Sequence, residues 1–318
     1  MNESRLILGV LTWPRLARLT GNVVMTKLML PDVTLCAVTS INYELTVRAM
    51  LRCLEQCSFA DVVLIAGQPV EAPFRVEVVP PFRGIDYAPL VCRNLTHYTP
   101  SAYNLLVQYD GYIVDASAWT DAFYDYDFVG AKWPWHIEGR RVGNSGFCLR
   151  SKKLLDIMAE MPLPNAGEFF DDTYFCHTLR EPLERNYGIK FASEAVADQF
   201  AYERHKPDRP TFGFHGMFNV WRYVDDLEME QICGQLDDLY VTWRPYAEIL
   251  FYYYDARKFP VFRTWYHRLR QRIGKEEMPA HLLQYVKDAA FVAGLVECGE
   301  RLFAPESGEI AANHRQSA

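Results

Sequence analysis

The 318-residue sequence lacks several signatures that would place it in a common class of protein. Its eight cysteines are scattered without a C-x-x-C pair, which argues against a zinc ribbon or a thioredoxin-like motif and favours small buried thiols in a reducing compartment. It contains no G-x-x-x-x-G-K-[ST] loop, no G-x-G-x-x-G turn and no G-x-S-x-G elbow. P-loop NTPases, classical dinucleotide oxidoreductases and α/β-hydrolases are therefore disfavoured.

Positive charge and long apolar runs are also scarce. The 33 Lys and Arg residues are outnumbered by 40 Asp and Glu residues, so we expect no nucleic-acid partner. No apolar run reaches the ~18 residues of a membrane-spanning helix. The apolar stretch 6–11 is soon followed by Pro14, Arg15 and Arg18, and no clean cleavage site follows it. We therefore expect a cytoplasmic protein, and residues 1–31 receive no assigned role.

What the sequence does contain is a large apolar fraction, 50%, with 14% aromatic residues, enough for a sizeable core. From residue 32 to about 216, short β-branched runs alternate with helical stretches. We predict strands at 33–39, 61–66, 76–79, 103–108 and 127–131, and helices at 43–57, 87–98 and 151–161. Strands separated by helices predict an α/β fold with a largely parallel sheet, whose ligands bind at the carboxyl ends of the strands.

The strand pattern stops near residue 220, and the rest of the chain is predicted to be helical. We expect helices at 224–238, 243–257, 259–273 and 279–303. The predicted organisation is an N-terminal segment (1–31), an α/β domain (32–222), a helical C-terminal extension (223–304) and a flexible tail (305–318).

Four local features are candidates for chemistry, and each has a plainer alternative. Asp110 follows an apolar strand and can bind a divalent cation, or it forms an ordinary Asp-Gly turn with Gly111. The stretch 142–151 has two glycines that permit close approach to a ligand, as many hairpins do. Asp171-Asp172 can act as paired carboxylates or simply cap a helix. His215, between glycines, is a ligand or a hydrogen-bonded structural residue.

Four blocks follow one another in order: Gln108–Gly111, Ala118-Trp119, Tyr126–Ala131 and Val142–Ser151. Together they resemble a family of largely uncharacterised glycosyltransferase-like proteins with Q-x-D-G, Y-D-[YF]-[IV]-G-A and G-N-G-G-F-S-L-R-S blocks. The resemblance covers roughly residues 32–216. It implies the GT-A nucleotide-diphospho-sugar transferase fold: a Rossmann-type sandwich with a mainly parallel central sheet, here followed by a helical extension.

The resemblance also implies a role for each matching position. In GT-A enzymes the last residue of an Asp-x-Asp binds Mn²⁺ or Mg²⁺; here Gln108 stands first and Asp110 last. His215 corresponds to a late histidine ligand, so Asp110 and His215 are the expected metal ligands. Asp172 is the expected general base, with Asp171 orienting it or capping the helix. The positions expected to bind the donor are Thr39, Ser40, Asn42, Arg83, Arg93, Gln108, Tyr109, Gly143, Asn144, Ser145 and Gly146.

The implied activity is metal-assisted transfer of a sugar, with inversion, from a nucleoside-diphosphate sugar to a hydroxyl, in bacterial glycan or surface-polysaccharide synthesis. A UDP-sugar donor and a glycan or lipid-linked acceptor are expected. Gln108 in place of the first carboxylate leaves open a catalytically silent nucleotide-sugar-binding or scaffold protein, and a nucleotidyltransferase has a similar sheet. Arg93 fits a solvated helix face equally well. The basic, aromatic stretch 257–275 can contact the inner membrane face or pack as an amphipathic helix.

Overall fold

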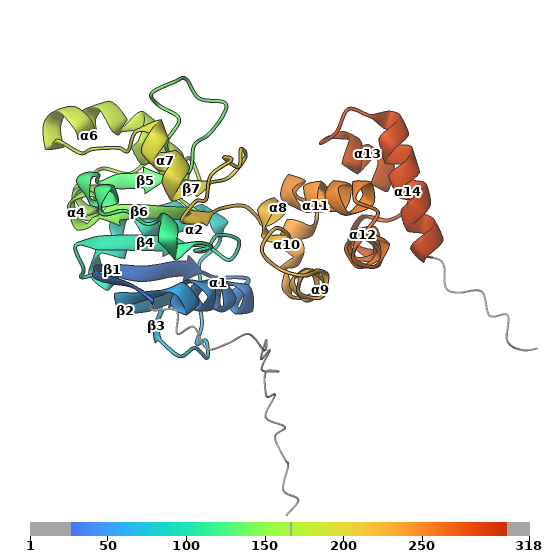
Figure 1. The fold of residues 1–318 in the computed structure, drawn as a ribbon, viewed down its shortest axis with the longest axis horizontal. Helices are drawn as coiled ribbons and strands as arrows, with labels where there is room; N and C mark the ends of the chain where they lie inside the picture. Colours follow the sequence, from blue (N-terminus) through green and yellow to red (C-terminus); the bar gives the residue numbers. More distant parts are fainter. Residues whose placement is uncertain (1–26, 166, 304–318) are drawn as a thin grey trace, which may run out of the picture.

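The computed structural model describes residues 27–165 and 167–303, and its centre is one six-stranded sheet (Figure 1). The strand order is β3-β2-β1-β4-β6-β5. The strands are β1 (Leu28–Thr39), β2 (Cys57–Ala66), β3 (Arg75–Val78), β4 (Tyr103–Val107), β5 (Phe128–Gly130) and β6 (Phe147–Ser151). The first four are parallel, whereas β6 runs antiparallel to both β4 and β5.

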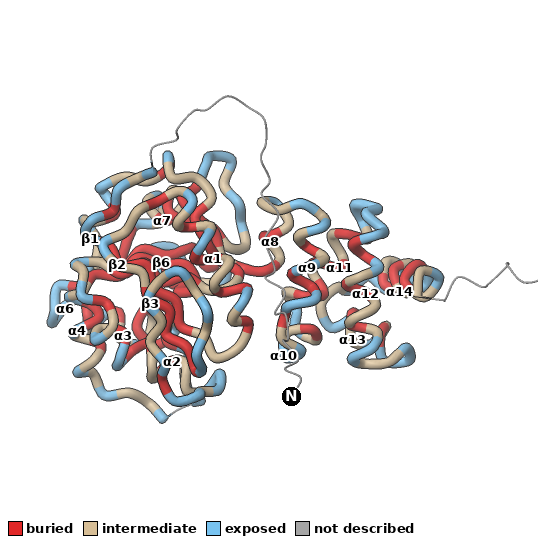
Figure 2. Tube along the Cα trace, turned by 90° about the horizontal axis from the view of Figure 1, so that it is seen from below, coloured by how far each residue is buried: buried red, intermediate tan, exposed pale blue. Residues whose placement is uncertain are grey.

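The central strand β1 is apolar on both faces. Leu35 lies opposite Val62 of β2 and Leu105 of β4, and residues 33–37 are fully buried. A strand without polar alternation is typical of a parallel sheet covered by helices on both sides. Figure 2 shows that the buried residues follow this sheet and continue into the C-terminal helices.

Helices cover the two faces of the sheet. α1 (Tyr43–Gln56) connects β1 to β2 on one side, while α2 (Gly84–Arg93) and α3 (Leu95–Tyr98) lead from β3 back across the sheet to β4. Because such crossovers are right-handed, connections that run in opposite directions along the sheet lie on opposite faces. α4 (Lys152–Glu160) packs against α2 and α3.

Shorter elements lie between β4 and the C-terminal helices. They are the 3₁₀ helices η1 (Ala116–Ala118) and η2 (Asp121–Asp125), α5 (Asp171–Thr173), the π-helical turn η3 (Tyr174–Thr178), α6 (Arg180–Tyr187), α7 (Glu194–Phe200), and the paired strands β7 (Ala201–Tyr202) and β8 (Gly213–Phe214).

The C-terminal extension is a bundle of helices with its own aromatic core, set to one side of the sheet in Figure 1. Its helices are α8 (Met217–Val220), α9 (Asp226–Gln235), α10 (Asp238–Val241), α11 (Arg244–Asp255), α12 (Phe259–Ile273), α13 (Met278–Leu283) and α14 (Ala289–Phe303). Trp265 and Tyr246 are fully buried within it. Ion pairs from Glu228 to Arg48 and Arg52 of α1 hold the bundle to the α/β domain.

The predicted α/β fold, with a mainly parallel central sheet and a helical C-terminal extension, is confirmed. The sequence reading missed β6, because Arg150 interrupts its apolar pattern. Two predicted helices, 87–98 and 279–303, are each divided in two. The predicted boundary at residue 222 falls between α8 and α9, whereas most of segment 1–31 and all of the tail 305–318 lie outside the described residues.

All eight cysteines are buried and unpaired, as expected for small apolar side chains. Within residues 27–165 and 167–303, none of the helices combines the length and apolarity needed to cross a bilayer.

Candidate active site

The candidate site begins with Asp110, which follows β4 at the edge where the parallel strands end. The side chain of Asp110 is buried, and its Oδ2 accepts a hydrogen bond of 3.0 Å from the backbone N–H of Met217 in α8. Its Oδ1 is buried without a hydrogen-bond partner among the described residues. Leaving a buried carboxylate oxygen unpaired is costly, so such an atom points to a ligand.

His215 faces this carboxylate from the other side of the site. It follows β8, and its Nε2 lies 3.5 Å from Asp110 Oδ1, again without a closer partner in the described chain. Its Nδ1 lies 3.1 Å from Asn144 Nδ2 and 3.5 Å from Glu203 Oε1. Burial lowers the pKa of His215, but the negative charges of Asp110 and Glu203 outweigh burial and raise it to about 10.

The predicted glycine loop forms the next wall of the site. Asn144 Oδ1 accepts a 3.1 Å hydrogen bond from the N–H of Gly146, and Ser145 is buried between them. A Cβ atom at Gly146 would overlap the imidazole of His215, and one at Gly143 would lie 2.5 Å from the ring of Trp133. Both positions therefore require glycine for close packing. The loop contacts the candidate metal ligand directly.

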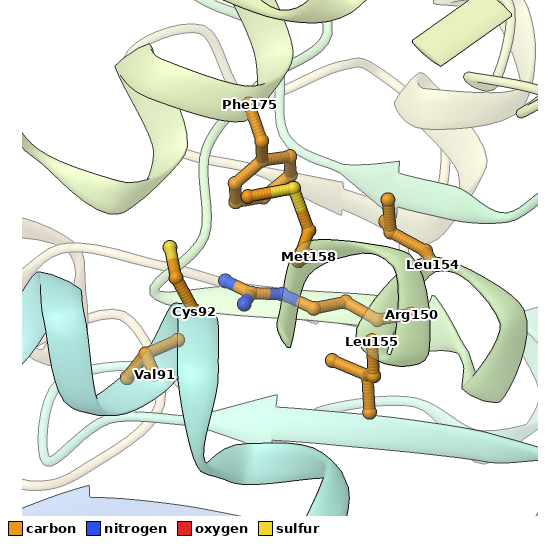
Figure 3. A pocket seen from close by; sticks show the side chains of 7 residues that line it. All are labelled: Val91, Cys92, Arg150, Leu154, Leu155, Met158 and Phe175. Carbon is orange, nitrogen blue, oxygen red and sulfur yellow. The ribbon is translucent and has the colours of Figure 1, made fainter. Parts of the chain in front are cut away.

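Asp171 and Asp172 have different surroundings. Asp171 is buried, and its Oδ2 accepts a 2.9 Å hydrogen bond from Arg150 Nη2. Arg150 is itself buried and also donates to Cys148 Sγ, at 3.3 Å. Figure 3 shows its side chain extending past Met158 toward Cys92. Asp171 is thus occupied by an interior ion pair.

Asp172 keeps a carboxyl group that can react. Its Oδ1 accepts a 2.7 Å hydrogen bond from the Thr173 N–H, and the residue is half-buried. Burial and the negative charge of Asp171 raise the pKa of Asp172 to about 7, although Arg150 and His215 oppose this shift.

The residues expected to hold the nucleoside lie where β1 and β4 end. Thr39 Oγ1 is hydrogen-bonded within its own turn, to the carbonyl of Ile41, and Ser40 follows it. Asn42 precedes α1 in the left-handed conformation, φ 53°. Gln108 donates a 3.0 Å hydrogen bond from Nε2 to the hydroxyl of Tyr87 in α2.

The two arginines expected to bind the donor, Arg83 and Arg93, are far apart. Arg83 precedes α2, on the side of the strand ends, whereas Arg93 ends this ten-residue helix. At 1.5 Å per residue the helix is about 15 Å long. From Arg93 the chain returns to the start of β4, so Arg93 lies toward the opposite edge of the sheet. Arg83 remains a candidate ligand of the phosphates, whereas Arg93 is exposed as on a solvated helix face.

Sequence reasoning missed three residues that shape the site: Arg150, Glu203 and Tyr87. An arginine inside the apolar block 147–151 was a usable signal, because a buried guanidinium needs a buried partner. Glu203 and Tyr87 carry no comparable signal, since only the fold brings them to His215 and Gln108.

The basic, aromatic stretch 257–275 contains α12, and three of the large aromatic side chains of this helix point inward, whereas Phe259 at its start is exposed. Phe262, Trp265 and Tyr266 are buried within the bundle, and Arg270 pairs with Glu300. This arrangement matches the amphipathic packed helix that we left as the alternative, and it gives the predicted membrane contact no support.

Comparison with known proteins gives a family match over part of the chain. A family model described as "Protein of unknown function (DUF5672)" matches residues 93–215. No curated protein matches the chain. A glycosyltransferase involved in glycosylation of the major capsid of PBCV-1 is similar in structure, with a TM-score of 0.34 and 12% identity, over 58% of this chain and 94% of that one.

A second similar structure is the mannosyltransferase PcManGT from Pyrobaculum calidifontis, solved with GDP-Man and Mn²⁺. Its TM-score is 0.38 and its identity 11%, over 85% of this chain and 87% of that one. At such identities the ligands remain properties of that enzyme alone. The family match, although it spans less than half of the chain, includes Asp110, Asn144, Asp172 and His215.

Proposed function

We propose that the protein is a glycosyltransferase that moves a sugar from a nucleoside-diphosphate sugar to a hydroxyl group, assisted by a divalent cation. The observation that carries the proposal is the ion pair of Asp110 Oδ1 and His215 Nε2, 3.5 Å apart at the end of β4, neither of which has a hydrogen-bond partner among the described residues. Asp172, whose pKa is raised to about 7, is the proposed base. Ligand atoms and a base at the carboxyl edge of a parallel sheet are what such a reaction requires.

The residues present fit a divalent cation. A carboxylate oxygen suits Mn²⁺ or Mg²⁺. The imidazole of His215, whose pKa is raised to about 10, would have to release its proton to coordinate the ion, so binding of the ion would release a proton. Glu203 stands behind the imidazole as carboxylates do behind metal-bound histidines. The described residues contain no group of three or more His, Cys, Asp or Glu that would hold an ion unaided. Asp110 and His215 would therefore share the ion with the donor's phosphates. When bound, the cation stabilises the charge on the departing diphosphate.

Asp172 is the group proposed to move the proton. A carboxylate at this place accepts the proton of the attacking hydroxyl as the bond to the sugar's anomeric carbon forms, which is typically worth 10²–10⁴-fold in rate. A pKa of about 7 makes Asp172 a stronger base than an ordinary aspartate while leaving a large ionised fraction at neutral pH. Asp171, neutralised by Arg150, fixes the start of α5.

The remaining residues are proposed to hold the donor. The loop 143–146 forms a wall for the sugar beside His215. Gln108 and Tyr109 flank the start of the diphosphate, and Arg83 contributes positive charge to it. Thr39, Ser40 and Asn42 lie on the nucleoside side. A UDP-sugar donor and a glycan or lipid-linked acceptor remain part of the proposal.

A thermal-shift panel of UDP-, GDP-, CMP- and dTDP-sugars, with and without Mn²⁺, tests this function. We expect one donor class to raise Tm, and Mn²⁺ to increase the shift. Release of free nucleoside diphosphate should follow, and Asp110→Ala and Asp172→Ala should abolish it. Binding without turnover would indicate the catalytically silent alternative, release of pyrophosphate a nucleotidyltransferase, and binding of no nucleotide sugar would refute the proposal.

A further inference from the structure

The helical extension reaches the strand-end edge through α10 and the residue before it. The backbone N–H of Asp237 donates a 2.7 Å hydrogen bond to Asn42 Oδ1, at the end of β1. Three residues later, the ring of Tyr240 packs on Tyr109 at the end of β4, with 5.3 Å between the ring centroids. One short segment of the extension therefore touches the ends of both strands that carry the candidate nucleotide residues.

These contacts create a run of aromatic rings beside Asp110. Trp243 packs on Tyr240 at 4.7 Å between centroids, and we call Tyr109, Tyr240 and Trp243 the aromatic step. Trp243 is 52% exposed, unusually open for so large an apolar side chain.

The strand order decides which part of a donor would lie on this step. Along the sheet, β1 with Asn42 comes first, β4 with Asp110 next, and β6 with the loop 143–146 last. If the diphosphate lies at Asp110, its sugar end points to the side of β6, where Gly146 and His215 pack together. The nucleoside end then points to the side of β1, where Asp237, just before α10, contacts Asn42.

We infer that the aromatic step stacks on the nucleobase of the donor, so that the helical extension supplies one wall of the nucleotide site. This inference rests on the proposed function. Planar aromatic rings stack on any base, because every base has a π-face. The side chain of Asn42 adds a polar group on the same side, since its Nδ2 is buried and has no hydrogen-bond partner in the described part of the chain. It can donate to a base carbonyl.

Calorimetric titration of the full chain with UDP, GDP and pyrophosphate, each with Mn²⁺, tests the inference. Pyrophosphate has the two phosphates without a base. We expect Trp243→Ala and Tyr240→Ala each to weaken UDP or GDP binding by roughly 5- to 100-fold, the range of one lost stacking contact. Binding of pyrophosphate should remain unchanged. Leu239→Ala is the matched control, because Leu239 is 60% exposed on α10 but is not part of the step.

Each alternative outcome has a distinct meaning. If the wild-type chain binds UDP or GDP and both step variants bind it equally well, the inference is wrong while the proposed function stands. If the variants lose pyrophosphate as strongly as nucleotide, the step acts on the phosphates or the fold, and the inference is again wrong. If the wild-type chain binds neither pyrophosphate nor nucleotide, the proposed function fails and the inference with it. Trp243→Ala, at an exposed position, guards against misfolding of Tyr240→Ala.

Discussion

Asp110 Oδ1 and His215 Nε2 face each other across 3.5 Å, and neither atom has a hydrogen-bond partner among the described residues. The position of the imidazole depends on Gly146, because the ring occupies the space that a Cβ atom at this position would need. A carboxylate and an imidazole held together in this way form half of a cation site, which a phosphate-bearing ligand can complete.

Gly146→Ala should therefore displace His215 and weaken Mn²⁺-dependent nucleotide binding by tenfold or more. The added methyl group overlaps the ring, and a side chain moves more easily than the backbone, so the fold should persist. Titration calorimetry with UDP or GDP and Mn²⁺ measures the effect. Gly84→Ala is the control, since no atom lies within 4 Å of a Cβ added there. Equal affinities in the two variants would show that the ring of His215 does not take part.

The sequence predicted the fold class and the approximate order of elements, because apolar periodicity reports burial directly. It also singled out Asp110 and His215, which the fold brings within 3.5 Å of each other, whereas the role given to Asp172 stays a prediction. It missed β6, whose Arg150 breaks the pattern that identifies a buried strand. The contacts of Glu203 with His215 and of Tyr240 with Tyr109 join segments far apart in the chain, and local patterns carry no information about such pairs.

Arg150→Met should destabilise the protein by about 3–5 kcal/mol, because it leaves Asp171 buried without its partner. The double variant Arg150→Met, Asp171→Asn should cost less than the single variant, since it leaves no unpaired carboxylate. Urea unfolding of the two variants measures both values. A single variant within 1 kcal/mol of the wild type would mean that the ion pair does not hold α5 in place.

Glu203→Gln should reduce Mn²⁺ affinity by about 10- to 100-fold in the presence of a nucleoside diphosphate, the usual cost of losing a carboxylate behind a metal-bound histidine. Electron paramagnetic resonance of free Mn²⁺ gives the affinity without any turnover. Glu194→Gln is the matched control, because Glu194 is also a half-buried glutamate but pairs with Arg141 instead. If both variants bind Mn²⁺ equally, Glu203 does not position His215.

The full chain should not sediment with anionic phospholipid vesicles. The large aromatic side chains of α12 that would enter a bilayer, Phe262, Trp265 and Tyr266, are buried between helices, and exposing them would require unfolding the bundle. Cosedimentation with vesicles of increasing phosphatidylserine content is the measurement. Binding that rises with anionic lipid and falls with salt would restore the membrane contact predicted from the sequence.

Asp172 should make activity and stability depend on pH in opposite directions. Its carboxylate form is the proposed base, so kcat/KM should rise with pH through an apparent pKa near 7, and Asp172→Asn should lose 10²–10⁴-fold. The folded protein binds the Asp172 proton more tightly than the unfolded chain does. The stabilisation from this protonated group is complete below the ordinary aspartate pKa and is lost as pH rises through about 7.

Replacing Asp172 with asparagine removes this loss, because the amide never ionises. The free energy of unfolding of the variant, relative to that of the wild type, should therefore increase by on the order of 1–3 kcal/mol when the pH rises from 5 to 8. Calorimetric Tm values at the two pH values give the comparison, with the exposed Asp208→Asn as the control. A Tm difference that does not change with pH would mean that Asp172 ionises like an ordinary aspartate. The ionised carboxylate of Asp172 lowers the stability of the fold, and its role as the base in the reaction explains why such a group is present. Asp172→Asn should therefore lose rate and, at high pH, gain stability, because a catalytic base with a raised pKa requires both effects in the same variant.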